Sequence, residues 1–219
     1  MIQTEDRVVI IGTFVSAPES KGAALLLHMM PSDRTSWMPF QGLLADRGVA
    51  SLAIDLRGHG ESTLQDGRRI SYQDFKDADH QRSSEDVRAS LRWLQTHGFP
   101  SERIVLAGAS IGANLALVAC SQDAQIRGAL LLSPGANYRG VKTFEAAAAL
   151  SPSQGLWAAA SMGDDEDSFQ ETKQLVERCS TKQKTFTPLT ASGHGTIMLD
   201  RRPDMAVKAV DWILSQFTS

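Results

Sequence analysis

Cysteine is scarce in this chain of 219 residues, which has two, Cys120 and Cys179. Both fall in stretches expected to be helical, and two buried free thiols suit a reducing compartment better than a disulfide framework does. The polar, acidic N-terminus, Met1 to Asp6, has neither the basic flank nor the apolar stretch of a secretory signal. We therefore expect a cytoplasmic protein.

An excess of charge of one sign and a long hydrophobic run are also lacking. Lys and Arg number 22 against 25 Asp and Glu, and no basic patch stands out, so nucleic acid is not an expected partner. The run of about 20 apolar residues that a membrane-spanning helix requires is missing. The length suits one domain over residues 1–219 with a full-sized core.

Signatures of cofactor binding are missing as well. Gly58-His59-Gly60 follows an expected strand, but the third glycine and the helix of a dinucleotide-binding loop do not follow it. The sequence contains no phosphate-binding Gly-x-x-x-x-Gly-Lys-Ser/Thr, and its histidines and cysteines lack the spacing of metal ligands. We expect no cofactor and no metal.

What the chain does contain is an alternation of short apolar runs with longer amphipathic stretches. Most runs are continuous, as expected of parallel strands covered on both faces. The expected strands are Val8–Val15, Ala23–Met29, Val49–Ile54, Ile104–Ala107, Ala129–Leu132, Leu156–Ala160 and Lys184–Leu189. The expected helices are Trp37–Arg47, Asp79–His97, Ile111–Cys120, Ser168–Ser180 and Asp204–Phe217. This order predicts an open, doubly wound α/β sheet, whose functional loops follow the carboxyl ends of the strands.

A glycine-flanked serine lies at one of the expected strand-to-helix junctions. The strand Ile104–Ala107 leads into Gly108-Ala109-Ser110-Ile111-Gly112, and Ile111 opens an apolar helix. In such a Gly-x-Ser-x-Gly turn, a tight bend holds the serine oxygen at the edge of the sheet, and the glycines let strand and helix pack closely. The strand before the motif and the helix after it argue against a chance match. Ser110 is therefore predicted to be a nucleophile.

A base is needed because a serine hydroxyl is a poor nucleophile until its proton is removed. Of the five histidines, His194 alone lies downstream of Ser110, as the chain order of this motif requires. It stands between two glycines, in a loop after the last expected strand. We expect His194 to be the base rather than a surface histidine in a flexible turn.

A carboxylate should orient the base and stabilise its charged form. The candidates lie in the acidic run Gly163-Asp164-Asp165-Glu166-Asp167, after the strand Leu156–Ala160. Most acids of such a loop face only solvent. We choose Asp165, and Asp164 stays the alternative because the spacing does not separate the two.

Backbone N–H groups must receive the negative oxygen of the tetrahedral intermediate. One donor is expected from Ile111, directly after the nucleophile. The other is expected from the loop His28-Met29-Met30-Pro31, at the end of the strand Ala23–Met29.

With these residues in view, the chain resembles the α/β-hydrolase family, above all its compact bacterial esterase and dienelactone-hydrolase-like members. The loop His28–Pro31 is similar to the family's His-Gly-x-Pro oxyanion loop, with Met29 in place of the glycine. The stretch Asp55-Leu56-Arg57-Gly58-His59-Gly60-Glu61-Ser62 resembles the family's turn at a strand end. With the serine motif and the His194 loop, these matches run from residue 28 to residue 195.

The resemblance implies an α/β-hydrolase fold: a mostly parallel, doubly wound sheet of about seven to eight strands with helices on both faces, and a minimal lid or none. The roles it implies are nucleophile for Ser110, base for His194, acid for Asp165, backbone oxyanion donors for Met30 and Ile111, and loop-holding scaffold for His28 and His59. It implies no cofactor.

The function expected from these roles is hydrolysis of small or accessible carboxylic esters by a serine hydrolase through an acyl-enzyme. A thioesterase, lactonase or peptidase would use the same three residues, and a binding protein that has lost catalysis is a further alternative. Apolar residues in or beside the strand-end loops could line an acyl site, with core packing as the alternative for each: Met30, Trp37, Met38, Leu64, Tyr138 and Met198. From these we choose Trp37, Tyr138 and Met198 as substrate-binding residues.

Overall fold

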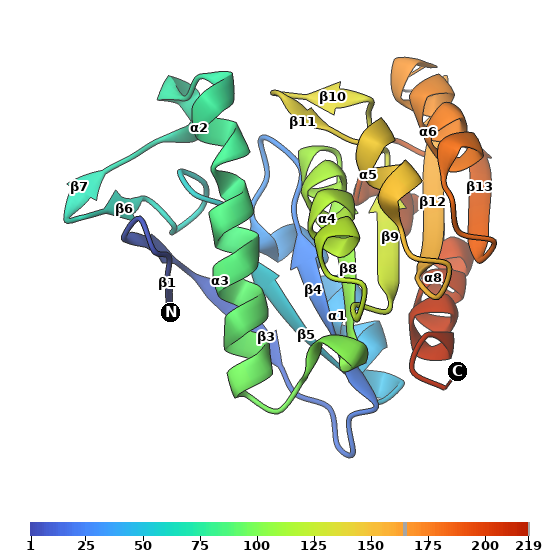
Figure 1. Ribbon diagram of the computed structural model, residues 1–219, viewed down its shortest axis with the longest axis horizontal. Helices are drawn as coiled ribbons and strands as arrows, with labels where there is room; N and C mark the ends of the chain where they lie inside the picture. Colours follow the sequence, from blue (N-terminus) through green and yellow to red (C-terminus); the bar gives the residue numbers. More distant parts are fainter. Residues whose placement is uncertain (164–165, 219) are drawn as a thin grey trace.

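A seven-stranded sheet forms the centre of the molecule in the computed structural model, which describes residues 1–163 and 166–218 (Figure 1). In spatial order the strands are β13 (Lys184–Thr190), β12 (Gly155–Met162), β9 (Gly128–Leu132), β8 (Ile104–Ala109), β4 (Gly22–Leu27), β5 (Val49–Ile54) and β3 (Gly12–Val15). Neighbouring strands are parallel except at the edge, where β3 runs antiparallel to β5. The predicted mostly parallel α/β sheet is confirmed.

Helices cover both faces of this sheet (Figure 1). On one face lie α3 (Ser83–Thr96), α4 (Ile111–Gln122), α5 (Phe144–Ala149) and α6 (Glu166–Arg178). On the other lie α1 (Met38–Asp46), α7 (Ile197–Arg201) and α8 (Pro203–Ser215). Short 3-10 turns precede α1 (Arg34–Trp37) and β8 (Ser101–Arg103). No helix of the described residues is long and apolar enough to cross a membrane.

The continuous apolar runs of the sequence are explained by the two-sided core. Along β4, Ala23, Leu25 and Leu27 belong to the hydrophobic cluster under α3 to α6, whereas Ala24 and Leu26 belong to the cluster under α1 and α8. Alternate side chains of a strand point to opposite faces, so every position is buried. Each fully buried leucine contributes about 1.5–3 kcal/mol to stability.

The expected strand Val8–Val15 is two strands in the structure. Its first half, β2 (Val8–Ile10), pairs antiparallel with β1 (Ile2–Gln3) and with β6 (Leu64–Gln65). Strand β6 also pairs with β7 (Arg68–Arg69), which completes a small separate sheet. Only the second half, β3, joins the central sheet, as its antiparallel edge.

The expected helix Asp79–His97 is also divided, into α2 (Asp77–Gln81) and α3. A 3-10 turn, Tyr72–Asp74, precedes α2. Between β9 and β12 the described chain forms only the hairpin of β10 (Asn137–Tyr138) and β11 (Val141–Lys142), followed by α5. The expectation of a minimal lid is confirmed.

Both cysteines are buried free thiols, as the sequence suggests. Burial raises the pKa of the Cys120 thiol well above its ordinary value, so this side chain behaves as a neutral core residue.

Candidate active site

Ser110 occupies a strained turn between β8 and α4. Its backbone torsions, φ 54° and ψ −121°, lie in a region that residues other than glycine rarely adopt. A Cβ atom on Gly108 would lie 2.1 Å from the carbonyl oxygen of Gly112, and one on Gly112 would lie 2.3 Å from the carbonyl oxygen of Leu27. The close approach of β8, α4 and β4 therefore requires both glycines, and it leaves Ser110 half-exposed at the carboxyl edge of the sheet.

The turn around Ser110 is fixed by backbone hydrogen bonds. The Ser110 N–H donates to the Leu132 carbonyl at 2.9 Å, which ties the turn to the end of β9. The Ser110 carbonyl accepts from the N–H groups of Ala113 at 2.9 Å and Asn114 at 3.2 Å. Ile111 is the first residue of α4, and N–H groups of a first helical turn have no acceptor within their own helix. Such groups favour negative charge beside Ser110.

The loop after β4 is held by the ring of His28. The Leu56 N–H donates to His28 Nε2 at 3.0 Å, so the proton of the neutral ring is on Nδ1, which donates to the Met29 carbonyl at 2.8 Å. Burial lowers the pKa of His28 to about 4, so the ring is neutral near pH 7. The loop carrying Met30 is thus fixed to the turn after β5.

The His194 loop connects β13 to α7 and is fixed to the ends of three strands. The Ser192 N–H donates to Ser161 Oγ of β12 at 2.8 Å, and the Gly195 N–H donates to Ser133 Oγ, after β9, at 3.0 Å. A Cβ atom on Gly195 would lie 3.2 Å from the Cβ of Ala109, the residue before Ser110. The neighbour of His194 in the chain therefore packs directly against the serine turn, and His194 itself is half-buried.

The two candidate acids, Asp165 and Asp164, lie outside the described residues. The described chain leaves β12 at Met162 and continues into α6 from Glu166. The choice of Asp165 as the acid that orients His194, with Asp164 as the alternative, stays a prediction.

Of the three residues chosen to line a substrate pocket, two are core residues. Trp37 and Met198 have no exposed surface and belong to the hydrophobic cluster under α1 and α8. Because neither side chain reaches the surface, Trp37 and Met198 can support the loops but do not contact a bound substrate. Tyr138, on the β10–β11 hairpin, is half-buried and packs against the opposite cluster together with Met30.

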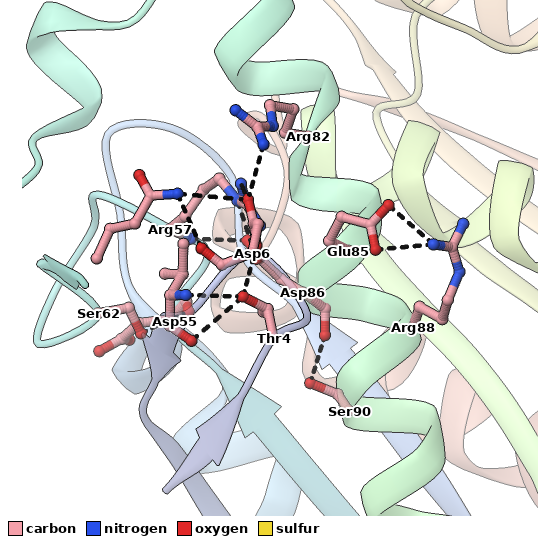
Figure 2. Close-up of polar contacts among 12 residues, drawn as sticks. Thr4, Asp6, Asp55, Arg57, Ser62, Arg82, Glu85, Asp86, Arg88 and Ser90 are labelled. Atoms are coloured by element: carbon pink, nitrogen blue, oxygen red, sulfur yellow. Dashed lines mark hydrogen bonds and ion pairs between the residues drawn. The ribbon is translucent and has the colours of Figure 1, made fainter.

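The turn after β5 contains a buried ion-pair network that sequence reasoning missed (Figure 2). The Arg57 guanidinium donates to Asp86 of α3 at 2.8 and 2.9 Å and to Asp6 at 2.7 Å. Burial raises the pKa of Asp86 to about 6, and Arg57 acts against this rise. Since Asp86 lies 29 residues beyond Arg57, no local pattern could have paired them.

His59 holds the same turn from inside. Its Nδ1 lies 3.0 Å from the Arg57 carbonyl, and its ring stacks on Tyr72 with centroids 4.1 Å apart. Burial, followed by the proximity of His28, lowers the pKa of His59 to about 4. His28 and His59 thus make the loop-holding hydrogen bonds expected of them, and both rings are neutral near pH 7.

Comparison with solved structures shows the same architecture in several esterases. The chain is similar to an esterase of Pyrococcus furiosus, at 20% identity and a TM-score of 0.80, over 100% of this chain and 89% of that one. It is similar to a thermophilic esterase of Thermogutta terrifontis, at 16% identity and a TM-score of 0.76, over 100% and 98% of the two chains. Est1E of Butyrivibrio proteoclasticus, with bound ferulic acid, shares 16% identity at a TM-score of 0.77, over 100% of both chains.

No curated protein matches the sequence. The sequence profile described as "Alpha/beta hydrolase family" matches residues 24–211, which include the loop after β4, the serine turn and the His194 loop. The chain belongs to the α/β hydrolase family.

Proposed function

We propose that this chain is a serine hydrolase that cleaves carboxylic esters of small or accessible acyl substrates. The observation that carries the proposal is the packing of the His194 loop, through Gly195, against the strained turn that presents Ser110. Within the α/β hydrolase family, a nucleophile and a base from remote parts of the chain meet at this edge of the sheet. Similar structures of esterases support ester substrates.

In the proposed reaction, Ser110 Oγ attacks the ester carbonyl while His194 accepts the serine proton. His194 then passes that proton to the leaving alcohol, and an acyl-enzyme remains on Ser110. Water activated by His194 releases the acid and restores the serine. Asp165 orients His194 and stabilises its charged form, with Asp164 as the alternative.

Negative charge on the carbonyl oxygen would be received by the N–H groups of Met30 and Ile111. Each such donor is worth about 10²–10³ in turnover. The bonds from Leu56 to His28 and from His28 to Met29 hold the loop of the first donor in place before substrate arrives, and the bond from Ser110 to Leu132 does so for the second. Preorganised dipoles need no rearrangement during the reaction.

The first test is Ser110→Ala, assayed with a panel of acyl esters, thioesters and lactones. We expect ester turnover to fall by roughly 10⁴ to 10⁶ with the fold intact. Ser121→Ala is the matched control, because Ser121 lies at the far end of α4, where its hydroxyl donates to the Val118 carbonyl of the same helix. A fluorophosphonate probe should modify the Ser110 peptide alone. Turnover retained within about tenfold in Ser110→Ala would disprove the assignment of Ser110 as the nucleophile. A preference for thioesters or lactones would change the proposed substrate class.

The acid is tested by comparing Asp165→Asn with Asp164→Asn. Loss of the orienting carboxylate costs about 10⁴ in turnover, so we expect that loss at position 165 and a far smaller one at position 164. The reverse order would move the role to Asp164.

A further inference from the structure

Met29 departs from the pattern of the family that the chain resembles, which has glycine there, and its side chain reaches the His194 loop. A Cβ atom on Gly195 would fall 2.5 Å from Met29 Sδ and 3.6 Å from Met29 Cβ. The thioether therefore occupies the space that a side chain at position 195 would need. Met29 is half-buried and packs against the cluster under α1 and α8.

The contact joins the two loops that flank the candidate nucleophile. The Met29 carbonyl accepts from His28 Nδ1 at 2.8 Å and from the Ser32 N–H at 2.9 Å, so its backbone is fixed. The Cβ position of Gly195 is bounded by both Met29 and Ala109, and the Gly195 N–H donates to Ser133 Oγ. A glycine at position 29 would leave the space beside Gly195 unfilled where the Met29 side chain now lies.

We propose that Met29 is a positioning residue, whose thioether holds Gly195, and through it the adjoining His194, against the serine turn. The inference rests on the proposed roles of Ser110 and His194. Methionine suits the task because its flexible, polarizable side chain adapts to an irregular gap. A base that is free to move away from the nucleophile loses turnover, because misplacement by about 1 Å can cost as much as 10²-fold.

The experiment compares Met29→Ala with Met29→Leu. Alanine keeps the Cβ atom and the backbone preference but removes the thioether, so we expect kcat to fall about 10-fold to 100-fold with KM changed by less than about threefold. Leucine refills most of the gap and should restore most of the lost kcat.

Leu214→Ala is the control for lost packing, because Leu214 is also half-buried against the same cluster but belongs to α8. It should lower the thermal midpoint as Met29→Ala does and leave kcat near that of the wild type. A kcat loss in Leu214→Ala equal to that of Met29→Ala would reduce Met29 to ordinary core packing and overturn the proposal.

A double-mutant cycle isolates the contact itself. Gly195→Ala should lose activity in the wild type because the new methyl group meets Met29 Sδ, and it should lose at least about tenfold less in the Met29→Ala background. The strain of alanine at the φ of +60° of Gly195 is present in both backgrounds and cancels. Losses that simply multiply would show that the two residues do not interact.

The rate of fluorophosphonate labelling separates this proposal from the one on which it rests. If the wild type is not labelled at Ser110, the proposed function fails. If the wild type is labelled and Met29→Ala is labelled equally fast, only the role of Met29 fails. Slow labelling of Met29→Ala, restored in Met29→Leu, supports both.

Discussion

At the scale of the single residue, the space around a glycine decides what a methyl group would do there. A Cβ atom on Gly112 would lie within 2.3 Å of the Leu27 carbonyl oxygen and 2.6 Å of that of His28. Both are backbone atoms of the central sheet and the loop after it, so only a shift of α4 can relieve the clash. Gly42, inside α1, has open space around its Cβ position.

Alanine substitutions at these two glycines should therefore change stability in opposite directions. We expect Gly42→Ala to stabilise the fold by about 0.5–1 kcal/mol, since alanine loses less backbone entropy in a helix. We expect Gly112→Ala to destabilise it by about 2 kcal/mol or more and to lower ester turnover, since the serine turn must open. Urea unfolding of both variants measures this, and equal midpoints would refute the steric account of the turn.

The role of Ser110 as nucleophile stays a prediction. Local sequence reasoning does locate the strained strand-to-helix turn at Ser110, because the steric requirement lies within five consecutive residues. It fails at Trp37 and Met198 because burial depends on what the rest of the chain places over them. Both residues follow strand-end loops, as pocket residues do. In the fold, however, both are completely buried in the hydrophobic cluster under α1 and α8.

At the scale of the element, long-range hydrogen bonds explain where the expected boundaries moved. Ile11 divides the run Val8–Val15 because its N–H donates to Ser62 Oγ at 2.9 Å and its carbonyl accepts from the Asp55 N–H at 2.9 Å. The turn after β5 thus takes up the N–H and carbonyl of Ile11, which would otherwise have joined β2 and β3 into one strand. The break at Arg82 carries no glycine or proline, and its torsions stay helical, φ −66° and ψ −10°, so periodicity alone could not reveal it.

The pairing of Arg57 with Asp86 gives a prediction for how α3 is attached to the turn after β5. In Arg57→Met, Asp86 keeps a buried carboxylate without its cation, which should cost about 3–5 kcal/mol at neutral pH. Part of this loss should be recovered as the pH falls from 7.5 to 5, because removal of Arg57 raises the pKa of Asp86 further and an unpaired Asp86 can then bind a proton. Denaturant unfolding at pH 7.5 and pH 5 measures both effects.

Arg88→Met is the matched control on the same helix. The side chains of Arg88 and Glu85 are 49% and 27% exposed, and exposed pairs contribute about 0–1 kcal/mol. If Arg57→Met costs no more than Arg88→Met, the buried network is not what attaches α3 to this turn.

At the scale of the whole molecule, the buried histidines and Asp86 act on stability in opposite directions as the pH falls. In the unfolded chain, His28 and His59 bind protons near pH 6.5, but in the folded protein burial delays this to about pH 4. The unfolded state binds more protons in that window, so the free energy of unfolding decreases as the pH decreases. Asp86 binds its proton near pH 6 when folded and near 3.8 when unfolded, which favours the folded state in the same window.

Burial also lowers the pKa of His80. Three buried histidines outweigh one carboxyl group, so we expect a net loss of stability between pH 6.5 and pH 4. The loss should be at least the contribution of a single deeply buried histidine, about 3 kcal/mol. It is measured as the free energy of unfolding in denaturant at half-unit steps of pH. His59→Asn keeps a donor for the Arg57 carbonyl but removes one titrating ring, so it should make the slope clearly shallower. His97→Asn, at an exposed histidine after α3, is the reference for the substitution itself, and an unchanged slope in His59→Asn relative to it would disprove the assignment of the acid sensitivity to the buried rings.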